Sequence, residues 1–309
     1  MFRKTVTVLL CVFMVAGSVI PQNTQMVYAL DNSYNETSDL EETENYYESE
    51  NIDPALIPVS VEDTTMRTET EKYFRKIDGT YEVAIYDAAV HYDDNGEWKD
   101  IDNRMVYNTN EDLYENMANK FKIKFPKTID YNKSIKLDMG DYSIDWNMLG
   151  INTSPISYED SNLSPNNIKE LVNINSSIIY ENVITNVNLE YTLSSTNIKE
   201  DIILEAYIHD YSAVFEYKLK NLELVETEEG KIEFINNNGE TVFEFSDLIM
   251  YDNDFNVSSD IEYTIIQTGN ITYEITITPS DEWLQDAAYP VKIDPSLIST
   301  TTSMSIYDT

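Results

Sequence analysis

The sequence predicts an all-β protein with antiparallel β-sandwich architecture. Apolar and polar residues alternate with a period of two in many short runs, which is typical of strands with one buried face. Asn-Gly dipeptides, a strong hairpin signal, stand at Asn95-Gly96 and Asn238-Gly239. No long amphipathic helical pattern follows the first 29 residues. We expect two packed β lobes, residues 66–150 and 166–295, separated by a turn-rich break.

Alternating runs mark the expected strands of both lobes. In the first lobe, a hairpin is also expected about Gly140. In the second lobe, residues 199–208 form a more continuous apolar run, which predicts a central strand buried on both faces. The side chains expected on buried faces are Tyr81, Val83, Ile85, Phe121, Ile123, Phe125, Tyr142, Ile144, Trp146, Val187, Leu189, Tyr191, Leu193, Phe215, Tyr217 and Leu219.

The segment of residues 271–295 is expected to close the fold. It begins with an alternating strand that Pro279 ends, because proline has no N–H for a sheet ladder. Ser280 is expected to cap a helical turn over residues 281–285, with Trp283 and Leu284 tucked under the sheet. A last short strand runs over residues 289–295. The following tail is residues 296–309, of which residues 297–309 are expected to be disordered or to lie loosely along the body, and to contribute no measurable stability.

The N-terminus has the pattern of a secretory signal peptide, residues 1–29. Arg3 and Lys4 precede an apolar stretch, and small residues at Val27 and Ala29 suit cleavage. The following acidic segment, residues 30–65, has too little apolar surface to offset the entropy of ordering, and predicts a disordered linker. We therefore expect a secreted or cell-surface protein, with no membrane span in the mature chain.

Charge and cysteine content exclude several classes of function. The formal net charge is −36, which repels nucleic acid and anionic lipid. We therefore expect no nucleic acid partner. The single cysteine, Cys11, lies in the expected signal peptide, so the mature chain has no disulfide, zinc–thiolate site or cysteine nucleophile.

No catalytic signature appears, so we assign no catalytic, cofactor-binding or metal-binding residue and expect no enzyme. The GxSxG, HExxH, Walker and dinucleotide-binding patterns are absent. His91 and His209 are the two histidines, and a lone histidine in a strand or turn is usually a packed or surface residue. Adjacent acidic residues such as Glu200 and Asp201 point to opposite faces of a strand, which argues against their acting together as a general acid and a general base.

Two acidic turns are the best candidates for binding a divalent cation. They contain Asp93, Asp94 and Asn95, and Asp252, Asn253 and Asp254. Neither has the spacing of an EF-hand loop. The turn preference of Asp and Asn explains both without a metal.

Several segments carry a family resemblance over residues 72–296. They are GTYEVAIYDAAVHYDDNGEWKDIDN (residues 79–103), ANKFKIKFPK (118–127), YSIDW (142–146), LEYTLSSTNIKEDIILE (189–205), GETVFEF (239–245) and DEWLQDAAYPVKIDPS (281–296). Together they resemble the N-terminal module of secreted Gram-positive wall-associated and Rhs (YD-repeat) proteins that carry DNRLRE-type domains. The tail resembles the start of a DNRLRE-type module.

The resemblance implies a non-enzymatic surface module. Cell-wall or surface components are the implied partners, together with the downstream repeat and toxin modules of the relatives. Two alternatives remain at this point: a carbohydrate-binding or adhesin β-sandwich, which needs an exposed aromatic platform, and a glycoside hydrolase. The hydrolase needs two facing carboxyl groups about 5–9 Å apart.

The signal peptide gives a direct prediction. Cleavage is expected after Ala29, because Val27 and Ala29 occupy the −3 and −1 positions that signal peptidase reads. Mass spectrometry of the exported protein should find Leu30 at the N-terminus. Exported protein that still carries Met1 would contradict the prediction.

Overall fold

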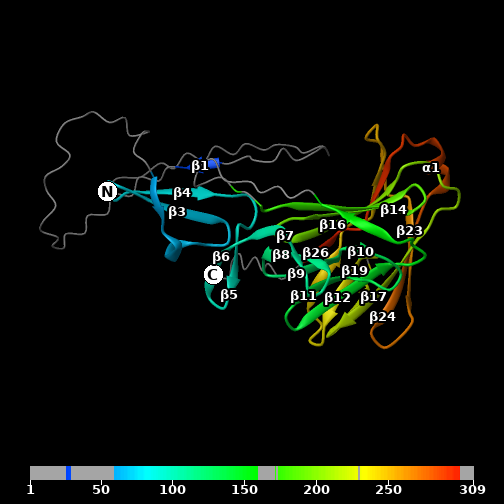
Figure 1. The fold of residues 1–309 in the computed structure, drawn as a ribbon, viewed down its shortest axis with the longest axis horizontal. Helices are drawn as coiled ribbons and strands as arrows, with labels where there is room; N and C mark the ends of the chain where they lie inside the picture. The colour runs from blue at the N-terminus through cyan, green and yellow to red at the C-terminus, as the bar shows by residue number, and fades with distance from the viewer. Residues whose placement is uncertain (1–25, 29–58, 159–170, 172, 229, 300–309) are drawn as a thin grey trace, which may run out of the picture.

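The computed structural model describes residues 26–28, 59–158, 171, 173–228 and 230–299. It is almost entirely β, with four antiparallel sheets of 12, 8, 4 and 2 strands (Figure 1). One short helix, α1 (Asp281–Asp286), and one 3-10 turn, η2 (Thr64–Met66), complete the regular structure in these ranges. The predicted all-β sandwich class is confirmed.

The eight-stranded sheet has the order β23-β24-β17-β12-β11-β9-β8-β7. Its strands in chain order are Asp102–Asn108 (β7), Leu113–Ala118 (β8), Lys122–Pro126 (β9), Ile135–Met139 (β11), Tyr142–Met148 (β12), Ala213–Lys220 (β17), Ile261–Gln267 (β23) and Thr272–Pro279 (β24).

The twelve-stranded sheet runs β10-β13-β14-β15-β16-β26-β20-β19-β18, with β25 pairing β16 and β21, and β22 pairing β21. Its strands are Thr128–Ile129 (β10), Ser154–Ser157 (β13), Ser176–Ile184 (β14), Val187–Leu193 (β15), Asn197–Leu204 (β16), Leu222–Glu226 (β18), Ile232–Asn236 (β19), Thr241–Phe245 (β20), Ile249–Tyr251 (β21), Val257–Ser258 (β22), Val291–Asp294 (β25) and Leu297–Ser299 (β26).

Aromatic rings from the two large sheets meet in one core. Tyr191 of β15 lies 5.3 Å from Phe125 of β9 and 6.4 Å from Trp146 of β12, measured between ring centroids. Tyr217 of β17 lies 6.2 Å from Phe234 of β19. Each ring alternates along its strand with outward-facing residues, so the period of two in the sequence places one face of each sheet in this core.

Strands on both sides of the expected lobe break pair with each other. β12 precedes residues 150–166 and β17 follows them, yet they form an antiparallel pair from Ser143↔Lys220 to Met148↔Phe215. The two expected lobes therefore share a sheet and one continuous hydrophobic core.

The predicted hairpins are present. Asn95 and Gly96 both have positive φ (57° and 90°), as the tight turn between β5 (His91–Asp94) and β6 (Glu97–Asp100) requires. Gly140 and Gly239 also have positive φ, between β11 and β12 and between β19 and β20. The strand β16 is central and buried, as the continuous apolar run predicts.

The closing segment follows its prediction except at Trp283. The Ser280 hydroxyl accepts a hydrogen bond from the Trp283 backbone N–H (3.4 Å) and caps α1. Leu284 is fully buried. Trp283 is only half-buried: it packs against the core and also lines a surface cavity. A single turn of helix can bury only one side, and Leu284 occupies that side.

The expectation that the tail stays outside the fold is wrong for its first residues. Leu297–Ser299 form β26, which pairs with β16 on one side and β20 on the other. Leu297 is buried in the core. The expectation failed because Leu297 and Ile298 offer too short an apolar pattern to recognise in a Ser- and Thr-rich segment. Residues 300–309 of the expected tail lie outside the described residues.

A smaller N-terminal unit precedes the sandwich. Its four-stranded sheet has the order β1-β4-β3-β2 and consists of Met26–Tyr28, Tyr81–Ile85, Glu71–Lys76 and Val59–Glu62, respectively. β2 falls inside the expected linker, of which residues 30–58 lie outside the described residues. β1 belongs to the expected signal peptide, so cleavage after Ala29 would leave β4 as the edge of this sheet.

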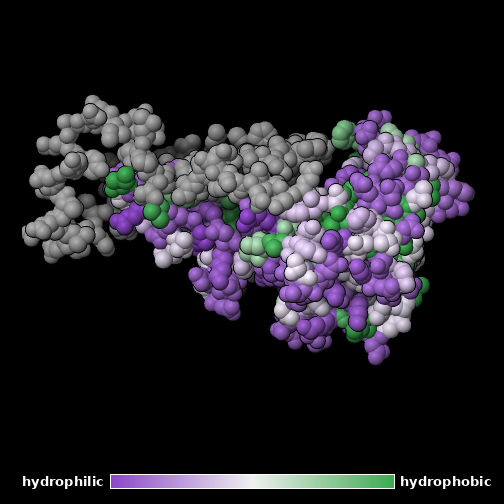
Figure 2. Space-filling view, viewed as in Figure 1, coloured by the Kyte–Doolittle hydropathy of each residue, from purple (hydrophilic) through white to green (hydrophobic). Residues whose placement is uncertain are grey.

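The surface is hydrophilic and carries no broad apolar patch on the face in view. Figure 2 shows polar residues covering most of the sandwich, with hydrophobic residues scattered among them. Exposed apolar side chains such as Val106, Met117 and Val257 come from different strands. Single exposed hydrophobic residues of this kind are normal for a soluble surface.

One carboxyl group is buried inside the aromatic core. Glu200 of β16 accepts a hydrogen bond from the Tyr191 hydroxyl (3.0 Å) and shares a cavity of only about 10 Å³ with Trp146 and Tyr217. Burial raises the pKa of Glu200 from 4.5 to about 8, and hydrogen bonding opposes this only in part. The folded protein therefore holds Glu200 protonated at neutral pH.

The Glu200 pKa predicts how stability depends on pH. Because the folded pKa lies above the unfolded one, the folded state loses stability as pH rises from about 4.5 to about 8. Glu200→Gln removes this titration. Between pH 5 and pH 8 we expect the wild type to lose roughly 2–4 kcal/mol of unfolding free energy relative to the variant. Urea unfolding at several pH values measures the difference.

The exposed Glu216 of β17 supplies the matched control. Glu216→Gln should leave the pH profile of the wild type unchanged. Parallel pH profiles for the wild type and Glu200→Gln would show that Glu200 does not titrate in this range.

Candidate functional site

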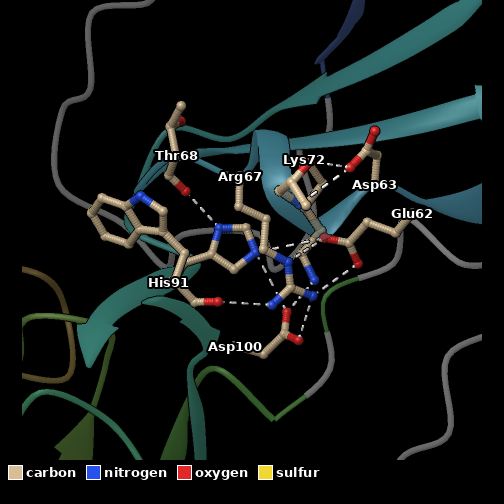
Figure 3. A network of polar contacts seen from close by, with 9 residues as sticks. Glu62, Asp63, Arg67, Thr68, Lys72, His91 and Asp100 are labelled. Carbon is tan, nitrogen blue, oxygen red and sulfur yellow. Dashed lines mark hydrogen bonds and ion pairs between the residues drawn. The ribbon is translucent and has the colours of Figure 1, made fainter. Parts of the chain in front are cut away.

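A charged network in the N-terminal unit brings together the kinds of side chain that active sites use. It comprises Glu62 at the end of β2, Arg67 and Lys72 around the start of β3, His91 at the start of β5, and Asp100 at the end of β6 (Figure 3). The turn η2 positions Arg67. The Asp63 carboxylate caps η2 by accepting from the Thr65 N–H (3.2 Å).

The Arg67 guanidinium lies at the centre of the network. Its Nε and Nη2 donate to the two oxygens of Glu62 at 2.6 and 3.0 Å, the bidentate geometry that suits a planar guanidinium. Nη2 also reaches Asp100 (2.9 Å), and Nη1 donates to the Trp98 carbonyl (3.2 Å). The Arg67 side chain is only 9% exposed. Its donors are therefore engaged within the protein.

His91 lies beside the same carboxylates. Its Nδ1 donates to the Thr68 carbonyl (2.6 Å), because a carbonyl can only accept, and this fixes a proton on Nδ1. Nε2 points toward Asp100 Oδ1 (3.5 Å) and Glu62 Oε1 (3.9 Å). The ring has no exposed surface. His91 is thus a packed residue, as expected for a lone strand histidine.

The cations around Asp100 keep it ionised. Burial alone would raise the pKa of Asp100, but the hydrogen bond from Lys72 and the positive charges of Lys72 and Arg67 outweigh burial and lower it. Lys72 Nζ lies 2.5 Å from Asp100 Oδ1. The negative charges of Glu62 and Asp100 are thus matched by cations that face them.

The network joins strands and does not present its cations to a substrate. A guanidinium and an ammonium group are common phosphate ligands, and an imidazole transfers protons. Here a phosphate would have to displace Glu62 or Asp100 from Arg67. The arrangement instead ties β2 and β3 to the β5–β6 hairpin.

A cavity of about 220 Å³ borders the network. It lies between the N-terminal unit and the sandwich, with His91 and Trp98 on one side and Asn119 and Ser195 on the other. Asn119 Nδ2 donates to the Ser195 carbonyl and to Asn103 Oδ1, both at 3.1 Å. Buried amides therefore form its floor.

A second cavity, of about 430 Å³, lies beside α1. Trp283 lines it with carboxylates from Asp260, Glu282 and Asp286. A carboxylate-rich wall repels phosphate and favours cationic or neutral polar groups. Trp283 presents only part of one ring here, and no aromatic platform of several rings lines this cavity.

The two acidic turns are capping structures. Asp93 Oδ1 accepts the Gly96 N–H (2.5 Å), and Asp94 pairs with Lys99. Asp252 Oδ1 accepts the N–H groups of Asp254 (3.0 Å) and Asn256 (2.9 Å). Its Oδ2 accepts from Asn256 Nδ2 (2.9 Å) and the Ala288 N–H (3.0 Å). These bonds account for the turn residues without a cation.

Sequence reasoning missed both the Arg67 network and the burial of Glu200. Glu62 lies in the acidic segment expected to be a linker, residues 30–65, and Arg67 lies directly after it. Asp100 is the last residue of a hairpin dominated by turn residues. Glu200 stands in a run whose apolar character did predict a buried strand, and that burial was the available signal. In the described part of the chain, no helix is long and apolar enough to cross a membrane.

Comparison with known proteins gives a functional context. No family model matches the chain, and no solved structure matches it. A curated relative in Bacillus subtilis (strain 168), named tRNA nuclease WapA, is 27% identical over 292 residues. A tRNA3(Ser)-specific nuclease WapA of Bacillus spizizenii is 26% identical over 264 residues.

The matches cover most of this chain and a small part of the relatives. The alignments span 89% and 80% of the chain, but 12% and 11% of the respective relatives. The name WapA denotes a wall-associated protein, which agrees with the expected location outside the cell or at its surface.

The relatives correct several expectations. A non-enzymatic module, a sugar-binding or adhesin sandwich and a glycoside hydrolase were expected as the possible functions, without a nucleic acid partner. The relatives are instead named as nucleases that act on tRNA. They support a likeness to wall-associated proteins, but give no support for the specific resemblance to Rhs and DNRLRE-type modules. The missing catalytic motifs and the negative charge led to the wrong expectations about enzyme activity and nucleic acid, because both describe this chain and not the much longer relatives.

Proposed function

We propose that this chain is part of a secreted, wall-associated tRNA nuclease of the kind that its relatives' names describe. The observation that carries the proposal is 27% identity over 292 residues to a tRNA nuclease, spread across 89% of this chain. Because that stretch is 12% of the relative, the proposal concerns the activity of the protein that contains the chain. It assigns bond cleavage to no residue named above.

Other features of the chain support a role outside the cell. The expected signal peptide provides a route of export. The described β-structure is mostly hydrophilic on the face shown in Figure 2, and it has a core of aromatic and aliphatic side chains. Such a body suits a protein that works in the cell wall.

The proposal is tested in the producing cell. Wall extracts are incubated with tRNA, and cleavage is followed on denaturing gels. An in-frame deletion of residues 66–295 should abolish the cleavage seen with the unaltered extract. An immunoblot of the same extracts reports whether the protein still reaches the wall.

The substitution Glu216→Gln, on the exposed face of β17, serves as the control and should retain cleavage. Two results would overturn the proposal: an unaltered extract that leaves tRNA intact, or undiminished cleavage after the deletion.

A further inference from the structure

The fold brings one histidine and two aspartates together at the end of the sandwich that carries α1. His209 and Asp210 lie in the loop between β16 and β17. Asp281 is the first residue of α1, 71 positions after Asp210. One ligand atom from each residue can be chosen so that all three lie within 4.8 Å of one another. The sequence provided no reason to expect a metal site here, because Asp281 is far from His209 and Asp210 in the chain.

The contact between His209 and Asp281 has a length that suits coordination of a small divalent ion. His209 Nδ1 lies 3.4 Å from Asp281 Oδ2 and 3.2 Å from the Tyr207 hydroxyl, while the opposite ring nitrogen, Nε2, lies 3.3 Å from Asp210 Oδ2. In a tetrahedral zinc site with bonds of about 2.0–2.1 Å, neighbouring ligand atoms stand about 3.3–3.4 Å apart. An ion uses one nitrogen of the ring. Asp210, whose side chain is 79% exposed, is free to turn toward it.

Other residues hold Asp281 in place. The Tyr207 hydroxyl donates to its Oδ1 (3.0 Å), Gln285 Nε2 donates to Oδ2 (2.8 Å), and the Asp210 N–H donates to Oδ1 (3.0 Å). Hydrogen-bonded carboxylates of this kind are typical supports of metal sites.

We propose that His209, Asp210 and Asp281 bind a divalent transition-metal ion of the zinc class at the protein surface. Imidazole nitrogen distinguishes this class from calcium and magnesium, which prefer oxygen ligands alone. Three protein ligands leave the remaining position to water. The side chain of His209 is 71% exposed, which gives an ion direct access. The negative charge of the chain raises the local concentration of cations.

The competing explanation is a protonated His209 bridging two carboxylates without an ion. NMR of the imidazole groups separates the two, because the chain has only two histidines. Untagged, isotope-labelled full chain is titrated with Zn²⁺. The His209 signals should shift and saturate at one equivalent, while those of the buried His91 should stay in place.

Calorimetry with Zn²⁺ then tests the ligands singly. His209→Ala and Asp281→Asn should each weaken binding by about tenfold or more. Glu282→Gln, which removes a neighbouring charge on α1 outside the cluster, should change the dissociation constant less than about twofold. Circular dichroism should give the same melting temperature for His209→Ala, since the side chain is exposed and outside the core.

Unmoved His209 signals, or Zn²⁺ binding that survives His209→Ala, would overturn the proposal. Equally strong responses to Ca²⁺ that do not depend on His209 would also overturn it, because they would indicate attraction by the acidic surface alone. The test reads metal binding and does not depend on whether the protein cleaves tRNA.

Discussion

The contact between the two large sheets is the interaction on which the rest of the structure depends. Each sheet has an apolar face, and it buries this face against the other sheet. Tyr191 and Tyr217 carry much of this contact. Tyr191 touches Phe125, Trp146 and Tyr180, and the ring of Tyr217 lies nearly parallel to that of Trp146, at 9°. The protonated state of Glu200 is a consequence of the same packing, because the rings exclude water from the carboxyl group.

The N-terminal unit depends more on polar contacts than on a hydrophobic core. Among the residues that the structure describes, its buried apolar cluster has four members, Phe74, Ala84, Tyr86 and Val90. So small a core stabilises little, and polar contacts set the geometry instead. The bonds from Arg67 Nη2 to Asp100 (2.9 Å) and from the Val90 N–H to the Glu69 carbonyl (2.8 Å) hold the β5–β6 hairpin against the small sheet. Partly buried ion pairs of this kind specify an arrangement more reliably than they add stability.

Local pattern predicted the strands and turns, but not which strands meet. Alternation placed Phe125 and Tyr217 on buried faces, and Asn95-Gly96 located a hairpin, because these signals depend on near neighbours in sequence. The pairing of β12 with β17 depends on residues about 70 positions apart and has no local signature. The meeting of His209 with Asp281 has the same cause. The function could not be predicted from local patterns, since the link to tRNA nucleases lies in similarity along the chain and not in any motif.

The position of β16 has a consequence for the order of folding during export. β16 ends at Leu204, but its partners on one side, β25 and β26, begin only at Val291 and Leu297. A chain that crosses a membrane from its N-terminus exposes β16 long before these partners arrive. During that interval its backbone groups on this side are unpaired, on a strand that carries the apolar residues Ile202 and Leu204. Such an exposed edge can pair with strands of other chains. Rapid translocation, or a chaperone at the exit of the export channel, would protect this edge until the last strands close it.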